Sequence, residues 1–249
     1  MNPQTSIKKN DKTHADQFDK YPVNRGFVGM FFFCLGMLGT YVLLRFKSQG
    51  KKNIPSEKPY VIAANHQTYV DGMWVASFLP RKHFKVLCSL AGSDLETEHG
   101  RLGRLIMRVG QCIAIDRFGS PIRGLIKAKK EIEKGKIILV HPEGTRTHDG
   151  HVAPLKDGAA YIAIKAGVPI LPVYIEGGYH VFSRHMKKPA PWDSKKKRRR
   201  LVIVHYGPPV SPETFDKNPH AMTEAVQNWM HQMEKNANGK AEGITSNRT

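Results

Sequence analysis

The sequence has few cysteines, and this shortage excludes several classes of protein. Its three cysteines stand apart from one another and none belongs to a C-x-x-C pair, so neither a disulfide framework nor a zinc site is supported. A reducing compartment suits such a chain best. The sequence also lacks a G-x-S-x-G motif, the turn that presents the serine of many hydrolases. We therefore expect no metal ion, no cofactor and no serine nucleophile.

Acidic residues are scarce too, with 21 Asp and Glu against 39 Lys and Arg and a formal net charge of +18. Such an excess indicates an anionic partner: nucleic acid, a membrane surface, or a phosphorylated or acidic substrate or carrier. The longest basic run, KKKRRR at residues 195–200, has the composition of a surface that binds nucleic acid. Beside an apolar segment it more simply predicts contact with anionic lipid headgroups. We expect no nucleic-acid partner, while an acidic carrier protein and a solvated loop remain alternatives.

Charge is also absent from a stretch near the N-terminus. Between Arg25 and Arg45, roughly nineteen residues carry no charge, close to the ~20 that a helix needs to cross a bilayer. A signal peptide is the competing interpretation, but a polar leader precedes the run and no Ala-x-Ala-like cleavage site follows it. Glycines in the run permit a bend or close helix packing, so a single span and a segment lying in one leaflet are both open. Basic residues flank both ends and select no orientation.

From residue 60 onward, short apolar runs alternate with amphipathic segments. The apolar runs predict strands at residues 60–64, 85–90, 111–115, 137–140, 170–175 and 201–205. Apolar residues at helical spacing predict helices at residues 102–108, 121–133, 158–166 and 222–234. This alternation predicts an α/β fold in which helices flank a mostly parallel or mixed sheet.

Composition divides the chain into four parts. Residues 1–24 form a polar leader, and residues 25–58 a membrane-anchoring helical segment with a basic linker. Residues 59–235 are long enough for one substantial core, and we expect them to form the folded domain. Residues 236–249 are polar and contain glycine, which predicts a flexible tail.

The stretch NHQTYVD, residues 65–71, follows an apolar run where a strand should empty into a loop. On a regular helix, residues five apart point about 140° away from each other, so His66 and Asp71 can meet only if His66 precedes the helix and Asp71 lies in its first turns. Asp71 would then accept a hydrogen bond from one ring nitrogen and leave the other free to act as a base. The helix N-terminus would keep the imidazole neutral. In the alternative, Asn65 caps a helix and His66 is an incidental surface residue.

The stretch HPEGTRT, residues 141–147, follows the apolar run 137–140 in the same way. Gly144 permits a tight turn with exposed backbone N–H groups, which suits an oxyanion or a phosphate. Arg146 adds a guanidinium that matches phosphate oxygens. The alternative is an ordinary turn with a solvated arginine. Asn65 and Thr145 are expected to be cap and turn residues that also line the site. Glu143 is expected either to orient Arg146 or the turn, or to contribute directly to the site.

These motifs, with two further blocks in the same order, resemble those of the 1-acylglycerol-3-phosphate acyltransferase family of glycerolipid acyltransferases. In that family NHxxxxD carries the catalytic pair and a PEGTR-type motif binds the acceptor phosphate. Residues 110–117, GQCIAIDR, resemble the block that ends in Ile-Asp-Arg, and residues 168–173, VPILPV, resemble a strand associated with acyl-donor binding. The resemblance implies a glycerolipid acyltransferase fold for the catalytic domain and three groups of site residues: the catalytic pair His66 and Asp71; the phosphate-binding residues Arg146, Glu143, Gly144, Thr145 and Arg117; and the acyl-donor pocket residues Asn65, Val168, Pro169, Ile170 and Pro172.

The resemblance also implies a reaction and its partners. His66 would remove the proton of the sn-2 hydroxyl of 1-acyl-glycerol-3-phosphate (lysophosphatidate), and the oxygen would attack the thioester of acyl-CoA or acyl-carrier-protein, giving phosphatidate for phospholipid synthesis. Backbone N–H groups near Gly144 would stabilise the oxyanion. Anionic membrane lipids would be a further partner, because the basic run at residues 195–200 accompanies an apolar segment. We expect an enzyme of the inner (cytoplasmic) membrane with its catalytic domain facing the cytoplasm.

Two departures from the family pattern leave the acceptor open. His141 stands where Phe or Val is usual. The block that ends at residue 117 also has, in the family, a half that contains glutamate and proline, and this half is not recognisable in residues 91–100. Because that region helps to shape the acceptor pocket, glycerol 3-phosphate, another lysophospholipid and a lyso-aminolipid are alternative acceptors. A basic membrane-binding protein without catalysis is the alternative of another kind.

Overall fold

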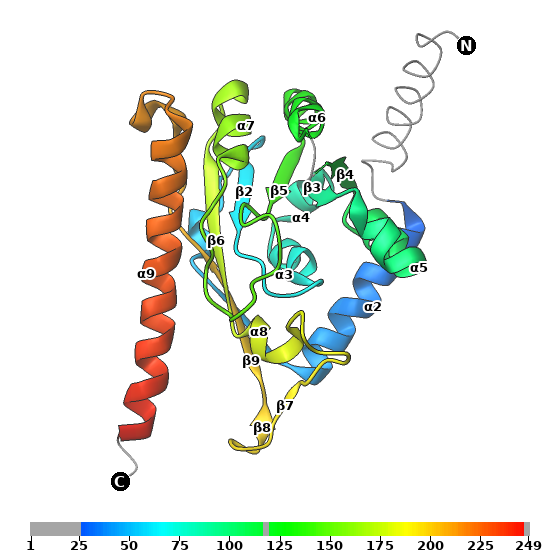
Figure 1. The fold of residues 1–249 in the computed structure, drawn as a ribbon, viewed down its shortest axis with the longest axis vertical. Helices are drawn as coiled ribbons and strands as arrows, with labels where there is room; N and C mark the ends of the chain where they lie inside the picture. Colours follow the sequence, from blue (N-terminus) through cyan, green and yellow to red (C-terminus); the bar gives the residue numbers. More distant parts are fainter. Residues whose placement is uncertain (1–25, 117–119, 247–249) are drawn as a thin grey trace, which may run out of the picture.

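The computed structural model describes residues 26–116 and 120–246 of the 249-residue chain. The predicted polar leader, residues 1–24, and Arg117 of the predicted phosphate site lie outside the described residues. In the described part, helices cover both faces of a central sheet (Figure 1). The predicted α/β architecture is therefore confirmed.

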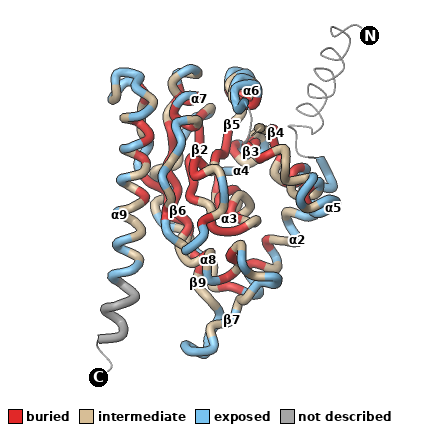
Figure 2. Tube along the Cα trace, viewed as in Figure 1, coloured by how far each residue is buried: buried red, intermediate tan, exposed pale blue. Residues whose placement is uncertain are grey.

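Seven strands form the central sheet: β1 (Arg45–Gln49), β2 (Val61–Ala64), β3 (Leu87–Gly92), β4 (Cys112–Ile115), β5 (Ile137–Val140), β6 (Ile170–Glu176) and β9 (Leu201–Tyr206). Their order is β1-β9-β6-β2-β5-β3-β4, and all neighbours run parallel except the antiparallel pair β6 and β9. The two strands that carry the motifs, β2 and β5, are buried along their whole length, which is why each reads as a continuous apolar run (Figure 2). A separate two-stranded ribbon pairs β7 (Trp192–Asp193) with β8 (Arg198–Arg199).

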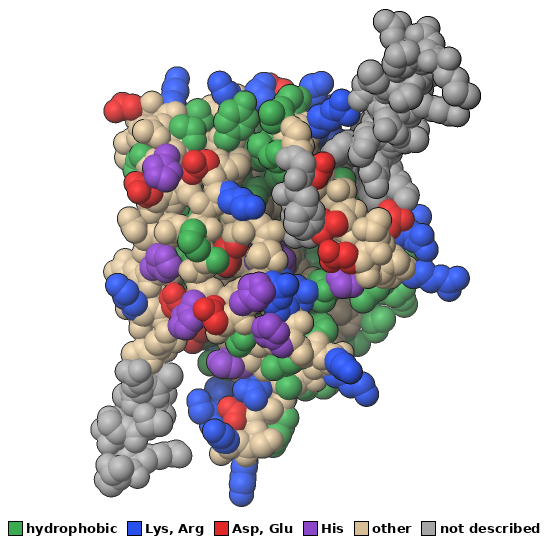
Figure 3. Space-filling view, in the orientation of Figure 1, with side chains coloured by type: hydrophobic (Ala, Val, Ile, Leu, Met, Phe, Trp, Pro, Cys, Tyr) green, Lys and Arg blue, Asp and Glu red, His purple; other side chains and the backbone are tan. Residues whose placement is uncertain are grey.

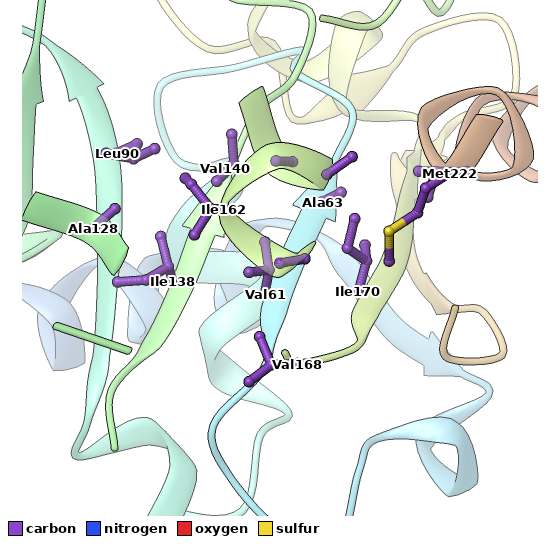
Figure 4. Packing of buried hydrophobic residues seen from close by; sticks show 14 of the residues in the cluster. Val61, Ala63, Leu90, Ala128, Ile138, Val140, Ile162, Val168, Ile170 and Met222 are labelled. Carbon is purple, nitrogen blue, oxygen red and sulfur yellow. The ribbon is translucent and has the colours of Figure 1, made fainter. Parts of the chain in front are cut away.

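One face of the sheet is covered by α6 (Ile122–Glu133), α7 (Gly158–Ala166) and α9 (Pro219–Ser246). Their apolar sides pack against alternate residues of the central strands, such as Val61 and Ile138 (Figure 4). Burial of these side chains is the main contribution that holds the three helices on the sheet.

The other face is covered by α2 (Phe27–Leu43), α3 (Asp71–Ser77) and α8 (Gly178–Phe182). These helices pack against the intervening strand residues, such as Ile62 and Leu139. The remaining helices are short or lie at the edges of the sheet: α4 (Arg81–Phe84), α5 (Asp94–Val109), and the 3-10 turns η1 (Lys51–Asn53) and η2 (Pro212–Phe215).

Three of the differences from the sequence-based prediction are large. β1 lies in the segment expected to be a basic linker, and it pairs in register with β9, so the sheet begins before residue 59. α5 begins at Asp94, in a region without helical periodicity, and is interrupted by Gly100, whose φ is +51°. α9 continues to Ser246, ten residues past the predicted start of the tail at residue 236. The prediction missed these three segments because their side chains are largely polar, and hydrophobic periodicity detects only elements with an apolar face.

α2 coincides with the apolar stretch near the N-terminus. It approaches the domain closely at two glycines: a Cβ at Gly29 would meet the carbonyl of Arg108, and one at Gly36 would meet the side chain of Met73. The rest of its surface is largely exposed and apolar. Among the described residues, we find no helix with both the length and the apolar character required to cross a bilayer.

Candidate active site

The strand order brings the two motifs together. β2 and β5 are neighbouring parallel strands, with Ala63 opposite Val140. The residues that follow them therefore meet at one edge of the sheet, where open α/β sheets bind their ligands. A backbone hydrogen bond of 2.8 Å from the N–H of Thr147 to the carbonyl of His66 joins the two loops directly.

His66 and Asp71 form a hydrogen-bonded pair. His66 precedes α3, Asp71 is the first residue of that helix, and His66 Nδ1 lies 2.9 Å from Asp71 Oδ2. The buried carboxylate also accepts backbone N–H bonds from Gln67 at 2.6 Å and Thr68 at 2.8 Å. Burial by itself raises the pKa of Asp71, but the hydrogen bond to His66 and the charge of His66 outweigh it, and the net effect lowers the pKa. Asp71 is therefore ionised and accepts the Nδ1 proton, which leaves His66 Nε2 as the atom that can take a proton.

His141, the departure from the family pattern, stacks on His66. The two ring centroids are 4.0 Å apart and the ring planes differ by 11°. His141 Nδ1 donates to the carbonyls of Ala64 at 3.0 Å and Asn65 at 3.1 Å. Burial, and next the positive charge of His66, lower the pKa of His141 to about 4. His141 is thus a neutral ring that is tied to the end of β2 and supports the face of the His66 imidazole.

Glu143 connects the second motif to the first. Its Oε1 accepts the backbone N–H of His66 at 2.6 Å, and its Oε2 accepts the N–H of Ala153 at 3.0 Å. Burial raises the pKa of Glu143 to about 7, although the two backbone hydrogen bonds oppose this. The sequence-based prediction gave Glu143 either an orienting role toward Arg146 or the turn, or a direct role in the site. Its carboxylate bonds to the backbone of His66 and Ala153 instead, so both roles stay predictions.

Arg146 is held by Tyr69, a residue of the first motif. The guanidinium carbon lies 3.6 Å from the centroid of the Tyr69 ring, and Nη2 donates to the Tyr69 hydroxyl at 2.6 Å. That hydroxyl also lies 2.6 Å from His99 Nε2. Arg146 and His66 are therefore positioned by the same pair of loops, as the sequence interpretation requires.

Gly144 forms the predicted tight turn, with a φ of +76°. Its N–H, however, donates to the carbonyl of His141 at 3.0 Å and belongs to the turn itself. Exposure of the other N–H groups of this turn to an anion stays a prediction. The N–H groups of Thr145 and Arg146 make no hydrogen bond within the described part of the chain, so they are the available backbone donors.

Asn65 has a structural position rather than the predicted cap position. Its buried side chain accepts the N–H of Ile175 at 2.7 Å and donates to the carbonyl of Ile175 at 3.1 Å. The residue before α3 is Val70, which makes no side-chain cap. Asn65 therefore ties the end of β2 to β6 and does not present its amide to the site.

The predicted acyl-donor residues of the fourth block do not gather around His66. Val168 and Pro169 directly precede β6, which begins at Ile170. Ile170 pairs with Val61 at the beginning of β2, the edge of the sheet opposite His66. Val168 and Ile170 belong to the hydrophobic core, and Pro172 is buried in mid-strand. The VPILPV run is placed as a central strand.

Three site residues also have the donor types of a metal site. In the described part, one ligand atom from each of His66, Asp71 and His141 lies within 4.8 Å of the others. Asp71 Oδ2 already accepts hydrogen bonds from His66 and from the backbone of Gln67 and Thr68, and His141 Nδ1 donates to carbonyls. A cation would have to displace these bonds, so the arrangement fits a base with its orienting acid better than a metal centre.

Comparison with known proteins decides the family. Residues 45–176, more than half of the chain, match the family model described as Acyltransferase. The chain belongs to the Acyltransferase family. The resemblance carried by the sequence motifs is confirmed.

Relatives of this acyltransferase carry consistent names. The chain is 32% identical over 133 residues to human 1-acyl-sn-glycerol-3-phosphate acyltransferase beta, covering 52% of this chain and 46% of the relative. It is 30% identical over 197 residues to the mouse alpha enzyme, covering 75% and 62%, and 27% identical over 217 residues to the Bacillus subtilis enzyme, covering 82% and 97%. The chain thus spans about half of the length of the human beta enzyme and less than two thirds of the length of the mouse alpha enzyme.

A solved structure shows the same fold. The crystal structure of the 1-acyl-sn-glycerophosphate (LPA) acyltransferase PlsC from Thermotoga maritima matches with a TM-score of 0.61 and 23% identity, covering 94% of this chain and 84% of that chain. The predicted glycerolipid acyltransferase fold is therefore confirmed.

Sequence reasoning missed Tyr69, His99 and Arg184 as neighbours of the site. Tyr69 lies inside the first motif, and its aromatic ring could have been predicted to stack on the arginine of the second motif. His99 and Arg184 lie outside all four blocks, and only the tertiary structure brings them to Tyr69 and to the loop after Arg146.

Proposed function

We propose that this acyltransferase transfers a fatty acyl group from acyl-CoA or acyl-carrier-protein to the sn-2 hydroxyl of lysophosphatidate, giving phosphatidate. The observation that carries the proposal is the placement of two groups on joined loops: an imidazole oriented by an ionised carboxylate at His66 and Asp71, and the guanidinium of Arg146. The names of the mammalian and Bacillus relatives support the same acceptor.

The reaction proceeds by direct transfer. His66 Nε2 takes the hydroxyl proton while the hydroxyl oxygen bonds to the thioester carbonyl carbon. The resulting oxyanion accepts a hydrogen bond from the backbone N–H of Thr145, and Asp71 stabilises the imidazolium. Collapse of the intermediate breaks the C–S bond, and the leaving thiolate takes the proton back from the imidazolium. Arg146 holds the acceptor phosphate throughout.

The proposal includes attachment of the enzyme to the cytoplasmic membrane through α2. One side of α2 packs on the domain, so the helix lies in one leaflet with its other side toward the lipid chains. Arg199 of the basic run donates to the carbonyl of Val42, at the end of α2, at 2.7 Å, which places cationic and apolar groups side by side. The exposed apolar side chains of α2 include Phe27, Phe31, Leu35, Leu38, Val42 and Leu43.

Release of free CoA thiol from acyl-CoA tests the proposal. Thiol release that depends on added lysophosphatidate, with phosphatidate as the product, supports it. A protein that binds anionic vesicles but releases no thiol with lysophosphatidate from either donor is instead a membrane-binding protein without this activity. Glycerol 3-phosphate, other lysophospholipids and lyso-aminolipids in the same assay identify a different acceptor.

A further inference from the structure

Arg184 is a charged side chain beside the site that none of the sequence motifs includes. It follows α8 by two residues, and its Nη1 donates to the carbonyl of Arg146 at 3.1 Å and to His148 Nε2 at 2.7 Å. Its guanidinium is therefore held against the loop that carries Arg146, the phosphate ligand of the proposed function, although Arg184 is distant from that loop in sequence.

The loop after Arg146 is fastened to the segment around α8 by further bonds. The carbonyl of His148 accepts the hydroxyl of Tyr179 at 2.8 Å and His185 Nε2 at 2.9 Å. Figure 3 shows histidine side chains next to Lys or Arg side chains in the middle of the face where Figure 1 places α8. The position of Arg184 thus follows from hydrogen bonds that join the two segments.

The two arginines differ from other basic side chains in their ionic partners. Among the residues whose side chains the structure describes, no carboxylate lies within ion-pair distance of Arg146 or Arg184, whereas Arg104, Lys129 and Arg200 each have one. Burial lowers the pKa of Arg146 and the positive charge of Arg184 lowers it further, while Tyr69, Asp71 and Glu98 oppose both effects. Two like charges held near each other carry a free-energy cost that a bound anion reduces.

We propose that Arg184 binds the phosphate of the acceptor together with Arg146, an inference that rests on the function proposed above. Nη1 of Arg184 is bonded to the protein, while its Nε and Nη2 make no hydrogen bond within the described residues; the same holds for Nε and Nη1 of Arg146. A phosphate monoester carries a charge of about −1.5 to −2 and three acceptor oxygens, so it can engage both guanidiniums. A diester headgroup has one charge and binds such a pair less well.

Binding of glycerol 3-phosphate, a soluble phosphate monoester, tests this by isothermal titration. Loss of hydrogen bonds to a charged group weakens binding roughly ten- to hundredfold, and we expect that loss for Arg184→Gln and partial recovery for Arg184→Lys. The matched control is Arg81→Gln, because Arg81 is exposed on α4, at the opposite edge of the sheet. It should bind like the wild type.

A double-variant measurement separates direct binding from support of the loop. If Arg184 touches the phosphate, Arg184→Gln weakens binding further in an Arg146→Gln background, and it raises the KM for lysophosphatidate without lowering kcat. If it acts only by holding the loop of Arg146, it has no further effect in that background, and the inference is overturned.

The same measurements distinguish this inference from the proposed function. Wild-type protein that binds glycerol 3-phosphate through both arginines but does not acylate lysophosphatidate leaves the inference standing and removes the proposed function. If the wild type acylates lysophosphatidate, but Arg184→Gln binds glycerol 3-phosphate and turns over normally, the proposed function stands and the inference is overturned.

Discussion

Asp71 sets the orientation of His66 at the scale of single residues. Its two oxygens accept hydrogen bonds from the imidazole, from two backbone N–H groups and from the hydroxyl of Thr68. These bonds hold the loop before α3 in one conformation and keep the carboxylate ionised. The chemical step in the proposed reaction then depends on the free Nε2 of His66.

Replacement of His66 by alanine removes the base. General base catalysis contributes on the order of 10²–10⁴-fold to the rate, so we expect His66→Ala to lose that factor in kcat while leaving the fold intact. His231→Ala on α9 is the control, since His231 is a partly exposed histidine outside the site. A His66→Ala enzyme that retains more than about a tenth of the wild-type rate contradicts the role.

Replacement of Arg146 by lysine keeps the charge but removes the flat guanidinium that stacks on Tyr69. We expect the KM for lysophosphatidate to rise roughly tenfold, with a smaller change in kcat, because one bidentate contact becomes a point charge. Steady-state kinetics at a saturating donor concentration measure this. An unchanged acceptor KM argues against a phosphate contact.

Glu143 links stability to pH. Because burial raises its pKa from 4.5 to about 7, the folded protein retains a proton that the unfolded chain releases in that interval. The stabilisation from this proton is complete below about pH 4.5 and is lost as the pH rises through about 7, a change of about 3 kcal/mol. We expect the free energy of unfolding of the wild type to fall relative to Glu143→Gln over this range. Urea unfolding that shows a pH-independent difference contradicts it.

At the scale of elements, α9 supports the loop that follows the second motif. Glu234 Oε1 accepts His151 Nδ1 at 3.1 Å and the N–H of Val152 at 3.2 Å, and Gln227 accepts the N–H of Leu155 at 2.7 Å. Since Glu143 bonds to the neighbouring Ala153, the helix, this loop and His66 form one connected unit.

Truncation of Glu234 tests that connection. Glu234→Ala leaves a backbone donor without its acceptor, so we expect a loss of about 1–3 kcal/mol in the free energy of unfolding. Glu224→Ala, which removes an exposed carboxylate from the same helix, should change it little. Equal effects of the two substitutions in urea unfolding would show that the contact to the loop adds nothing.

At the scale of the whole molecule, one surface combines the exposed apolar side of α2 with the basic run that begins at Lys195. Leu38 is 62% exposed at this surface. In the proposed membrane contact, apolar burial and attraction to anionic headgroups would act together there, and only the second would be weakened by salt.

Binding to phosphatidylglycerol vesicles measures the contribution of α2. Burial of one leucine is worth about 1.5–3 kcal/mol, so Leu38→Glu should weaken binding by about tenfold or more. Tyr161→Glu on α7 is the control, because Tyr161 is an exposed large side chain on the opposite face of the sheet. Equal binding by both variants excludes α2 as the contact.

Some features could be predicted because they depend on neighbouring residues. The strands that carry the motifs were recognisable from their apolar runs, and the five-residue spacing of His66 and Asp71 required the loop-then-helix geometry that is present. β1 escaped prediction because its outward residues, such as Lys47, are polar, and its strand character comes from pairing with β9.

By itself, the sequence determined the α/β class, the family and the two loops that bear the site, since each depends on local periodicity or on a contiguous motif. Only the tertiary structure decided that β2 and β5 are neighbours, that His141 stacks on His66, that VPILPV is core and that Arg184 joins Arg146. The physical reason is that strand order and side-chain contacts join residues that are far apart in the chain. Local sequence patterns do not specify which distant residues will be buried against each other.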